Sequence, residues 1–263
     1  MDSSGPSCGQ QISSSVLPRP LIYLIVQEAE QFAKSHFERI GDPSHDWPHV
    51  QRVRDLAFWL RGARSLNDQN EPTLRCDYLV LELAALFHDL VDPKLLPPDA
   101  VRSQAEPRDL ARAVLGPFWD DSKQGHAWML DVEQKDRIIE IIINIGWSKD
   151  QKRRKQAHVV YDELYKEGVY CWPEFRAISD ADRLDAIGAV GVMRCAAYSG
   201  VSGRQLLSSV ACVDSAVDHI HSKLLLIWGD RLFMNKAKVE AERRQETMRT
   251  FLHHLDWDAR TAQ

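Results

Sequence analysis

The chain has few of the features that mark secreted proteins, membrane proteins or zinc fingers. Its five cysteines are an odd number and include no Cys-x-x-Cys pair, which argues against a disulfide framework or a structural zinc site. The apolar run 21–26 is far shorter than the ~20 residues that span a bilayer. We therefore expect a cytoplasmic protein without a membrane partner.

The sequence also lacks the short motifs of several enzyme classes. It has no glycine-rich phosphate loop, no Gly-x-Ser-x-Gly elbow and no convincing cysteine nucleophile. Its formal net charge of −5 excludes a global basic field of the kind that binds duplex nucleic acid. The basic cluster at 152–155 is short, and it indicates a solvated helix face.

Alternating strand-like patterns are scarce, and apolar residues recur at helical intervals. Stripes of this kind lie at 50–60, 79–87, 178–188 and 213–224. A turn at 41–44 separates an expected helix at about 21–39 from another at about 49–62, and the proline-rich segment 92–98 predicts a loop. We expect an all-α fold of roughly eight to ten helices in one domain, residues 19–263, after a disordered tail at 1–18.

A polar pair, His88-Asp89, comes directly after one of these apolar stripes. Burying such a pair costs several kcal/mol unless it is paired or binds something. Neutral imidazole and carboxylate are good ligands for Zn, Mn or Fe. The side chains of adjacent residues on a regular helix point about 100° apart around its axis. Near a helix end the backbone departs from this regular geometry, so both side chains can reach one ion. Alternatively, the His is satisfied by hydrogen bonds and the Asp caps the helix.

Two further residues favour the metal-site interpretation. His49 opens the amphipathic stripe at 50–60, and Asp182 lies in a helix of mostly apolar or small residues. Asp182 and Asp185 also share a helix face at i, i+3. Two imidazoles and two carboxylates from different helices of one domain make a plausible ligand set.

With these residues the sequence resembles the HD-domain superfamily, whose name reflects its His…His-Asp…Asp order. These are all-α, metal-dependent phosphohydrolases with a minority of oxygenases. The resemblance implies a divalent ion (Mn, Mg, Co, Zn or Fe) held by His49, His88, Asp89 and Asp182. The segment 180–188, Asp-Ala-Asp-Arg-Leu-Asp-Ala-Ile-Gly, is its most specific part.

The likeness is closer to one compact branch, of the YedJ/YpgQ type, and spans about residues 30–255. Members of that branch often carry a His-Ser pair near the end of the middle helix. The matching stretch here is Asn144-Ile145-Gly146-Trp147-Ser148-Lys149. Any role of that histidine is therefore missing or moved in this chain.

Other polar residues near the motifs are candidates for catalysis and substrate binding. Asp92 is a candidate general acid or base, with a loop cap as the alternative. His45 and Asp180 are expected beside the ligands, His45 as a second catalytic candidate. Cations would offset the charge of a phosphorylated substrate; the candidates for substrate binding are Arg52, Lys94, Arg183, His219 and Lys223. The arginines could instead form ion pairs, Arg183 with Asp180 or another carboxylate.

These features predict hydrolysis of a small phosphate or pyrophosphate ester, such as a nucleotide, by a metal-activated water. One alternative is a di-iron oxygenase, which needs about two more ligands between the second and last motifs, where only His126 and His158 are available. A metal-binding protein without catalysis is another alternative. The expected partner is a small phosphorylated molecule, with no nucleic-acid duplex and no membrane.

Overall fold

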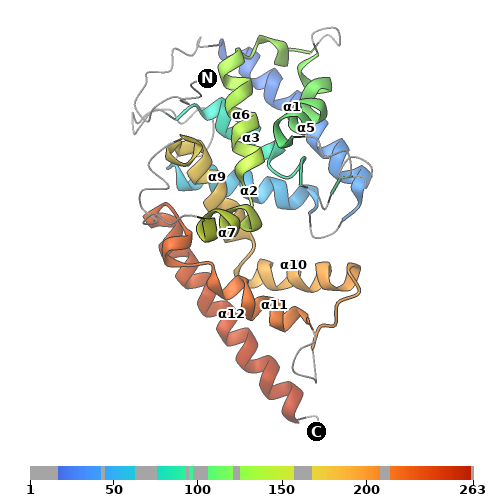
Figure 1. Ribbon diagram of the computed structural model, residues 1–263, viewed down its shortest axis with the longest axis vertical. Helices are drawn as coiled ribbons and strands as arrows, with labels where there is room; N and C mark the ends of the chain where they lie inside the picture. The colour runs from blue at the N-terminus through green and yellow to red at the C-terminus, as the bar shows by residue number, and fades with distance from the viewer. Residues whose placement is uncertain are drawn as a thin grey trace.

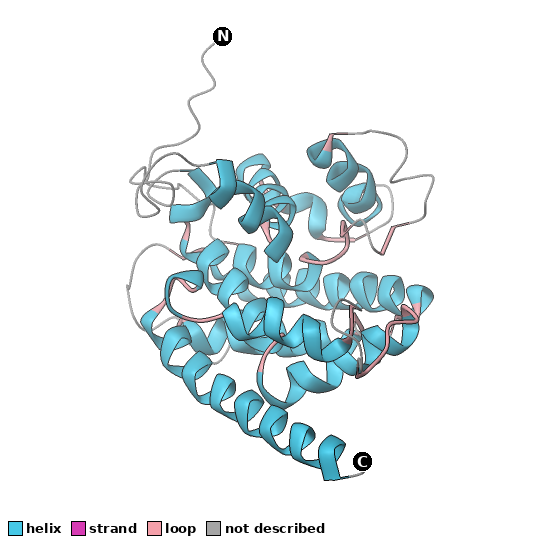
Figure 2. Cartoon of the chain, turned by 60° about the horizontal axis from the view of Figure 1, so that its bottom comes forward, coloured by secondary structure: helices cyan, strands magenta, loops and turns pink. Residues whose placement is uncertain are grey.

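The computed structural model describes residues 17–42, 45–62, 76–92, 95–96, 106–120, 125–156, 168–207 and 214–261. Across these ranges it contains ten α-helices and no β-strand (Figure 2). The α-helices are α1 (Arg19–Ile40), α2 (Trp47–Leu60), α3 (Tyr78–Phe87), α5 (Pro107–Trp119), α6 (Val132–Asn144), α7 (Trp147–Gln156), α9 (Pro173–Asp185), α10 (Gly188–Val201), α11 (Ala216–Ser222) and α12 (Asn235–Thr261). Short 3-10 turns are η2 (Ala127–Met129), η3 (Gly168–Cys171), η4 (Leu224–Leu226) and η5 (Gly229–Arg231). The predicted all-α architecture is confirmed.

The first two helices follow the sequence pattern closely, with ends that differ by a few residues. α2 begins at Trp47, two residues earlier than expected, because Asp46 caps its N-terminus and a proline follows in the first turn. α1 ends at Ile40, and Gly41 caps it with a backbone in the left-handed conformation, φ 68°. Of the predicted tail at 1–18, only 17 and 18 belong to the described residues.

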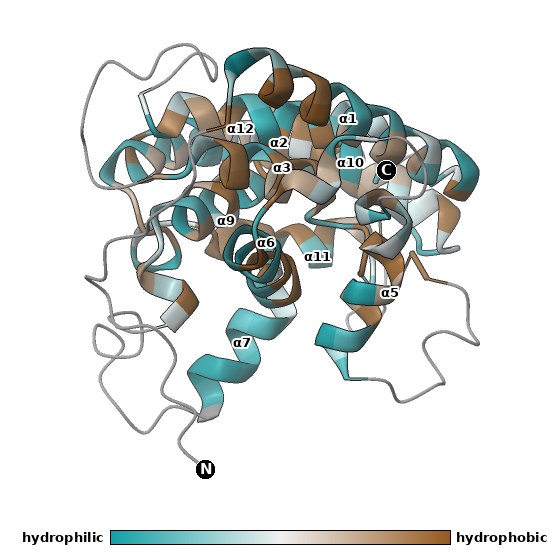
Figure 3. Ribbon diagram, turned by 90° about the horizontal axis from the view of Figure 1, so that it is seen from above, coloured by the Kyte–Doolittle hydropathy of each residue, from teal (hydrophilic) through white to brown (hydrophobic). Residues whose placement is uncertain are grey.

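Helix α3 lies at the centre of the bundle (Figure 1) and contacts α1, α2, α6 and α9. Every residue from Leu79 to Phe87 is buried, and the ribbon of α3 is correspondingly apolar (Figure 3). Apart from Glu82, which pairs with Arg54, these residues are apolar, and a helix that is apolar on nearly all sides belongs in the core of a protein. The polar pair that follows Phe87 therefore emerges inside the bundle.

Two other packing relations position the site. α2 packs along α9, so the beginning of α2 lies near the end of α9. α10, α11 and α12 form the lower part of the molecule in Figure 1, and α12 contacts both α9 and α10. None of the described helices has the length and apolar character needed to cross a bilayer.

Candidate metal centre

His49 is fixed in the first turn of α2 by the cap that starts the helix. The carboxylate of Asp46 accepts a hydrogen bond from the backbone N–H of His49 at 2.9 Å. Pro48 lies beside it in that turn, where its missing N–H costs nothing. The imidazole of His49 is fully buried and points into the bundle toward α3 and α9.

His88 and Asp89 lie where the chain leaves the α3 helix, as the sequence predicted. α3 ends at Phe87, and the next residues form a turn. His88 Nδ1–H donates to the carbonyl oxygen of Ala85 at 2.8 Å, which leaves Nε2 directed at His49 Nε2, 3.2 Å away. Asp89 Oδ2 lies 3.3 Å from the Nε2 atom of each histidine.

Asp182 completes the group from α9. Its Oδ1 lies 3.8 Å from His49 Nε2, and its side chain is 25% exposed, so the cluster is open to solvent on this side. Ligand atoms of His49, His88 and Asp182 all lie within 4.8 Å of one another. The fold thus brings the four residues of the His…His-Asp…Asp order together from three helices.

The hydrogen bonds around the two imidazoles show that a cation fits this cluster. Ionised Asp185 is an acceptor only, so His49 Nδ1 carries the proton that it donates to Oδ2 of that carboxylate at 2.7 Å. Because His88 Nδ1 also donates, both Nε2 lone pairs of the neutral rings face the same point, together with carboxylate oxygens. Such a convergence of lone pairs is unfavourable without a positive charge between them.

The pKa shifts of His88 and Asp89 also indicate that the cluster favours a positive charge at its centre. Burial lowers the pKa of His88, but the carboxylates of Asp89 and Asp182 and the hydrogen bond to Ala85 together outweigh it and raise the pKa to about 9. Burial raises the pKa of Asp89, yet the imidazoles of His88 and His49 hold that pKa well below its ordinary value. Without a metal, a proton on His88 therefore takes the place of the cation.

Asp185 anchors His49 from behind. Besides the imidazole, its carboxylate accepts hydrogen bonds from Arg52 Nε at 2.7 Å and from an Arg194 terminal nitrogen at 3.1 Å. Burial raises the pKa of Asp185, but the hydrogen bonds from His49 and Arg52, together with the charges of His49 and Arg194, outweigh it and lower the pKa far below the usual range. A carboxylate on the distal nitrogen of a ligating histidine fixes its tautomer and orientation. The i, i+3 spacing from Asp182 was the sequence signal for this residue, whereas nothing indicated Arg194.

The two arginines predicted to bind substrate make ion pairs in this structure. Arg52 pairs with Asp185 while its side chain remains 37% exposed. Arg183 is buried, its guanidinium lies 3.5 Å from Asp150, and it donates to the carbonyl oxygen of Arg231. For Arg183 this geometry favours the ion-pair alternative, with Asp150 rather than Asp180 as the carboxylate.

Of the two residues expected beside the ligands, Asp180 contacts the segment before α12, and His45 lies next to His49. Asp180 is fully buried and accepts hydrogen bonds from the backbone N–H groups of Phe233 and Met234 at 2.8–3.1 Å, just before α12. Burial raises the pKa of this carboxyl to about 6. The ring of His45 lies edge-on to that of His49, with 6.2 Å between centroids, and 3.5 Å separates its Nδ1 from Asp42.

The remaining described candidates come from the turn after the ligands and from the α11 region. The backbone N–H of Asp92 donates to the carbonyl oxygen of Asp89 at 3.1 Å, which places the residue in the turn that follows the ligands. His219 lies half-buried on α11, and Lys223 follows that helix. Lys94 lies outside the described residues. Lys149, which sequence reasoning did not select, experiences the charges of both Asp92 and Asp89.

Of the two histidines considered for an oxygenase site, His126 contacts another part of the described chain. His126 Nδ1 lies 2.6 Å from Glu28 on α1, and the backbone N–H of His126 donates to the same carboxylate. His158 lies outside the described residues.

The fold and the cluster define a helical, metal-binding protein of the HD type, and comparisons with known proteins agree. No family model matches the chain. The uncharacterized protein YpgQ of Bacillus subtilis is 34% identical over 236 residues, which cover 89% of this chain and 94% of that protein. The crystal structure of Bacillus subtilis YpgQ in complex with ADP has a TM-score of 0.57 at 27% identity, covering 90% of this chain and 96% of that one. An HD-superfamily hydrolase from Bacillus thuringiensis has a TM-score of 0.58 at 25% identity, covering 90% and 99%.

The chain therefore belongs to the YpgQ-like branch of the HD superfamily, a family of metal-dependent hydrolases.

Proposed function

We propose that this protein is a metal-dependent phosphohydrolase that cleaves a phosphate or pyrophosphate bond of a small molecule, with a nucleotide as the preferred class of substrate. The convergence of two imidazole lone pairs and two carboxylates at one point carries the proposal. The ADP bound to the similar Bacillus subtilis protein supports the choice of a nucleotide. Among the described cysteines, Cys76, Cys171 and Cys195 are free thiols, which fits the reducing cytoplasm where we place the enzyme.

His49, His88, Asp89 and Asp182 would hold the ion, with manganese the first metal to test. When bound, a divalent ion at such a site lowers the pKa of a coordinated water toward neutrality and polarises a phosphoryl oxygen. Asp185 keeps the Nε2 lone pair of His49 directed at the point where the ion would bind. The 25% exposure of Asp182 leaves one side of the cluster accessible to a substrate.

Asp92 is our candidate for the group that moves a proton, because it follows the ligands by one turn and lies near the ammonium of Lys149. His45 is the second candidate, since its ring borders that of His49. His219, Lys223 and Lys94 remain candidates for binding the substrate's negative charge, whereas Arg52 would reach it only by sharing its guanidinium with Asp185.

The test is metal analysis of the purified protein followed by a phosphate-release screen. The screen covers nucleoside mono-, di- and triphosphates and other small phosphate esters, with Mn²⁺, Mg²⁺, Co²⁺ or Zn²⁺ added. We expect about one bound ion per chain and metal-dependent release of phosphate or pyrophosphate. A metal-loaded protein that is inactive on the whole panel would contradict the proposal, and iron together with O₂ consumption would favour the oxygenase alternative.

A further inference from the structure

The hydrogen bonds that Asp185 accepts divide unevenly between its two carboxylate oxygens. Oδ1 accepts from Arg52 Nε at 2.7 Å. Oδ2 accepts from His49 Nδ1 at 2.7 Å, from a terminal nitrogen of Arg52 at 3.1 Å and from one of Arg194 at 3.1 Å. The oxygen that orients the imidazole of His49 is therefore the one that Arg194 also contacts.

The two arginines reach this carboxylate from different helices. Arg52 lies one turn after His49 on α2, its guanidinium contacts both oxygens, and its side chain is 37% exposed. Arg194 comes from α10, and its side chain is 16% exposed. Arg52 ties Asp185 to the helix that carries His49. Arg194 adds a contact from a helix that supplies none of the four candidate ligands.

The turn between α9 and α10, which places Arg194, is specified by two glycines. Gly188 has a φ of 77°, a backbone conformation that favours glycine. A β-carbon at Gly191 would lie 2.2 Å from the backbone oxygen of Ala186, which is too close for any side chain. α10 therefore leaves α9 at a fixed angle, and this angle brings Arg194 to an aspartate nine positions earlier in the chain.

Helix α12 supports the same turn through Arg244. Its guanidinium donates to the carbonyl oxygen of Leu184, near the end of α9, at 2.7 Å. The aliphatic part of the side chain lies against Gly188, where a β-carbon would be 3.1 Å from Cβ and Cγ of Arg244. Because these contacts do not involve Arg194, replacing Arg194 should leave α10 in place.

We propose that Arg194 is a positioning residue of the metal centre, which acts on His49 through Asp185. Its hydrogen bond restrains Oδ2 of Asp185, so that the Nε2 lone pair of His49 stays directed at the point where the ion would bind. The inference deepens the proposed function and rests on the metal site described there.

Two other roles for Arg194 predict different results. A cation that only lies near the site would repel the metal ion, so its removal would strengthen metal binding. A cation that only binds substrate would leave the metal affinity unchanged. Positioning predicts weaker metal binding when Arg194 is replaced, and it predicts that this loss requires Asp185.

The experiment measures the Mn²⁺ affinity of the full chain by competition with a metal-binding dye. The variants are Arg194→Met, Arg194→Lys, Asp185→Asn and the double variant Arg194→Met/Asp185→Asn. Urea denaturation of each metal-free variant establishes that it is folded under the conditions of the titration.

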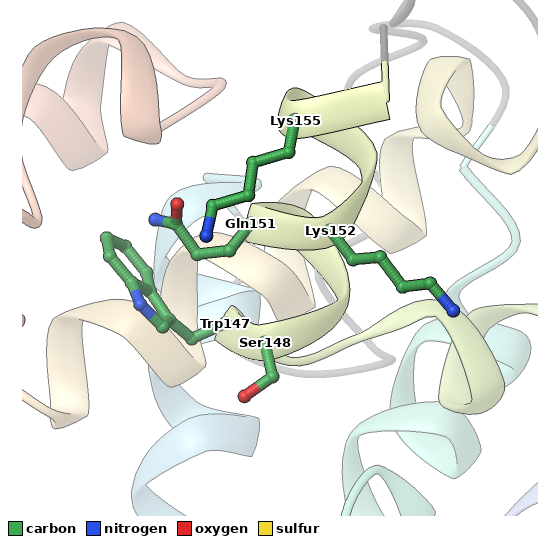
Figure 4. A pocket seen from close by; sticks show the side chains of 5 residues that line it. All are labelled: Trp147, Ser148, Gln151, Lys152 and Lys155. Carbon is green, nitrogen blue, oxygen red and sulfur yellow. The ribbon is translucent and has the colours of Figure 1, made fainter.

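Two control variants remove a positive charge elsewhere. Arg204→Met replaces an arginine of similar exposure, 18%, which pairs with Asp214 beyond the end of α10. Lys155→Met replaces a lysine of a pocket beside α7 that contains neither Asp185 nor its partners. That pocket, of about 600 Å³, is lined by Trp147, Ser148, Gln151, Lys152 and Lys155 (Figure 4).

We expect Arg194→Met to weaken Mn²⁺ binding roughly three- to tenfold, less than the 10–100-fold typical when a direct partner of a ligating histidine is lost. Arg194→Lys should recover most of the affinity, because one donor nitrogen makes the hydrogen bond to Oδ2. In the Asp185→Asn background, Arg194→Met should change the affinity less than about twofold, since the two residues act through one chain of contacts. Neither control should change it.

An unchanged or tighter affinity in Arg194→Met, or an equal loss with and without Asp185, would overturn the inference. If the wild-type chain binds no divalent ion, the inference and the proposed function both fail. If it binds Mn²⁺ but releases phosphate from no ester, the hydrolase proposal fails, whereas a loss in Arg194→Met that depends on Asp185 still supports the positioning role.

Discussion

Two buried aspartates, Asp185 and Asp150, each contact three side chains that donate hydrogen bonds or carry positive charge. Asp185 is 1% exposed and contacts Arg52, Arg194 and the imidazole of His49. Asp150 is fully buried, and its partners are the three guanidinium groups of Arg154, Arg183 and Arg231. The first carboxylate thus has a ring nitrogen among its partners, and the second has arginines alone.

This difference separates a carboxylate that orients a ligand from one that joins helices. Asp185 directs His49 Nε2 toward His88, Asp89 and Asp182, so its effect reaches the metal position. Asp150 joins α7 to α9 and η5. Because α7 has no apolar stripe of its own, charge supplies the anchoring that hydrophobic packing supplies elsewhere. A buried carboxylate with several donors therefore orients a metal ligand at Asp185 and stabilises the fold at Asp150.

The largest effect should come from removing a ligand of the metal. Asp89→Ala is expected to lower kcat/KM at least about a thousandfold, roughly 4 kcal/mol, because it withdraws one of two carboxylates from the cluster. The helical circular-dichroism signal should persist, since the core around α3 is apolar. Loss of that signal in step with activity would make the cluster structural instead.

Asp150→Asn should affect stability rather than the metal. It leaves three guanidinium groups next to a neutral amide, and breaking a buried ion pair in this way typically costs 3–5 kcal/mol. Chemical denaturation measures the loss. Asp230→Asn is the control, because that side chain is 67% exposed and its pairs should contribute less than about 1 kcal/mol. If the metal content of Asp150→Asn fell together with its stability, Asp150 would support the metal site as well as the fold.

The metal-free protein should lose stability as the pH rises. The pKa of His88 is raised from 6.5 to about 9, so the protonated ring stabilises the fold fully below pH 6.5, and this contribution disappears as the pH passes through 9. The difference should be up to about 3 kcal/mol. Denaturation of chelator-treated protein at pH 6 and pH 9.5 tests this. The metal-loaded protein, in which the ion replaces the proton, serves as the control; a fall of the same size there would contradict the interpretation.

Asp185→Asn should have the smallest effect, and a different one from Asp150→Asn. Loss of such a partner of a ligating histidine typically weakens metal binding about 10–100-fold, or 1.4–2.7 kcal/mol. The unfolding free energy should change less than in Asp150→Asn, because Arg52 is already 37% exposed. Competition with a metal-binding dye gives the affinity. An affinity equal to that of the wild type, with stability lost instead, would make both aspartates structural.

The sequence pattern was sufficient to predict the helical class and the residues of the cluster, because apolar stripes and a fixed motif order are local signals. Neighbours of the motif on α9 were harder to interpret. Successive residues of a helix diverge by about 100°. Arg183 therefore points toward Asp150 and Asp180 toward the start of α12, whereas Asp185, three positions after Asp182, returns to the face of the cluster.

Residues that reach the site from other helices could not be found this way. Arg194 reaches Asp185 across the turn between α9 and α10, and the charge of Asp89 acts on Lys149 of α7. Neither relation leaves a period or motif in the sequence. The first depends on the angle between two consecutive helices, and the second on packing between segments far apart in the chain.

The central claim is that His49, His88, Asp89 and Asp182 hold one divalent ion. Anomalous diffraction at the manganese edge, from crystals of the Mn²⁺-loaded protein, tests it most directly. We expect one strong peak about 2.0–2.3 Å from Nε2 of His49 and of His88 and from carboxylate oxygens of Asp89 and Asp182. A peak coordinated by His45 or Asp180 with His49 turned away, or no peak at this cluster, would contradict it.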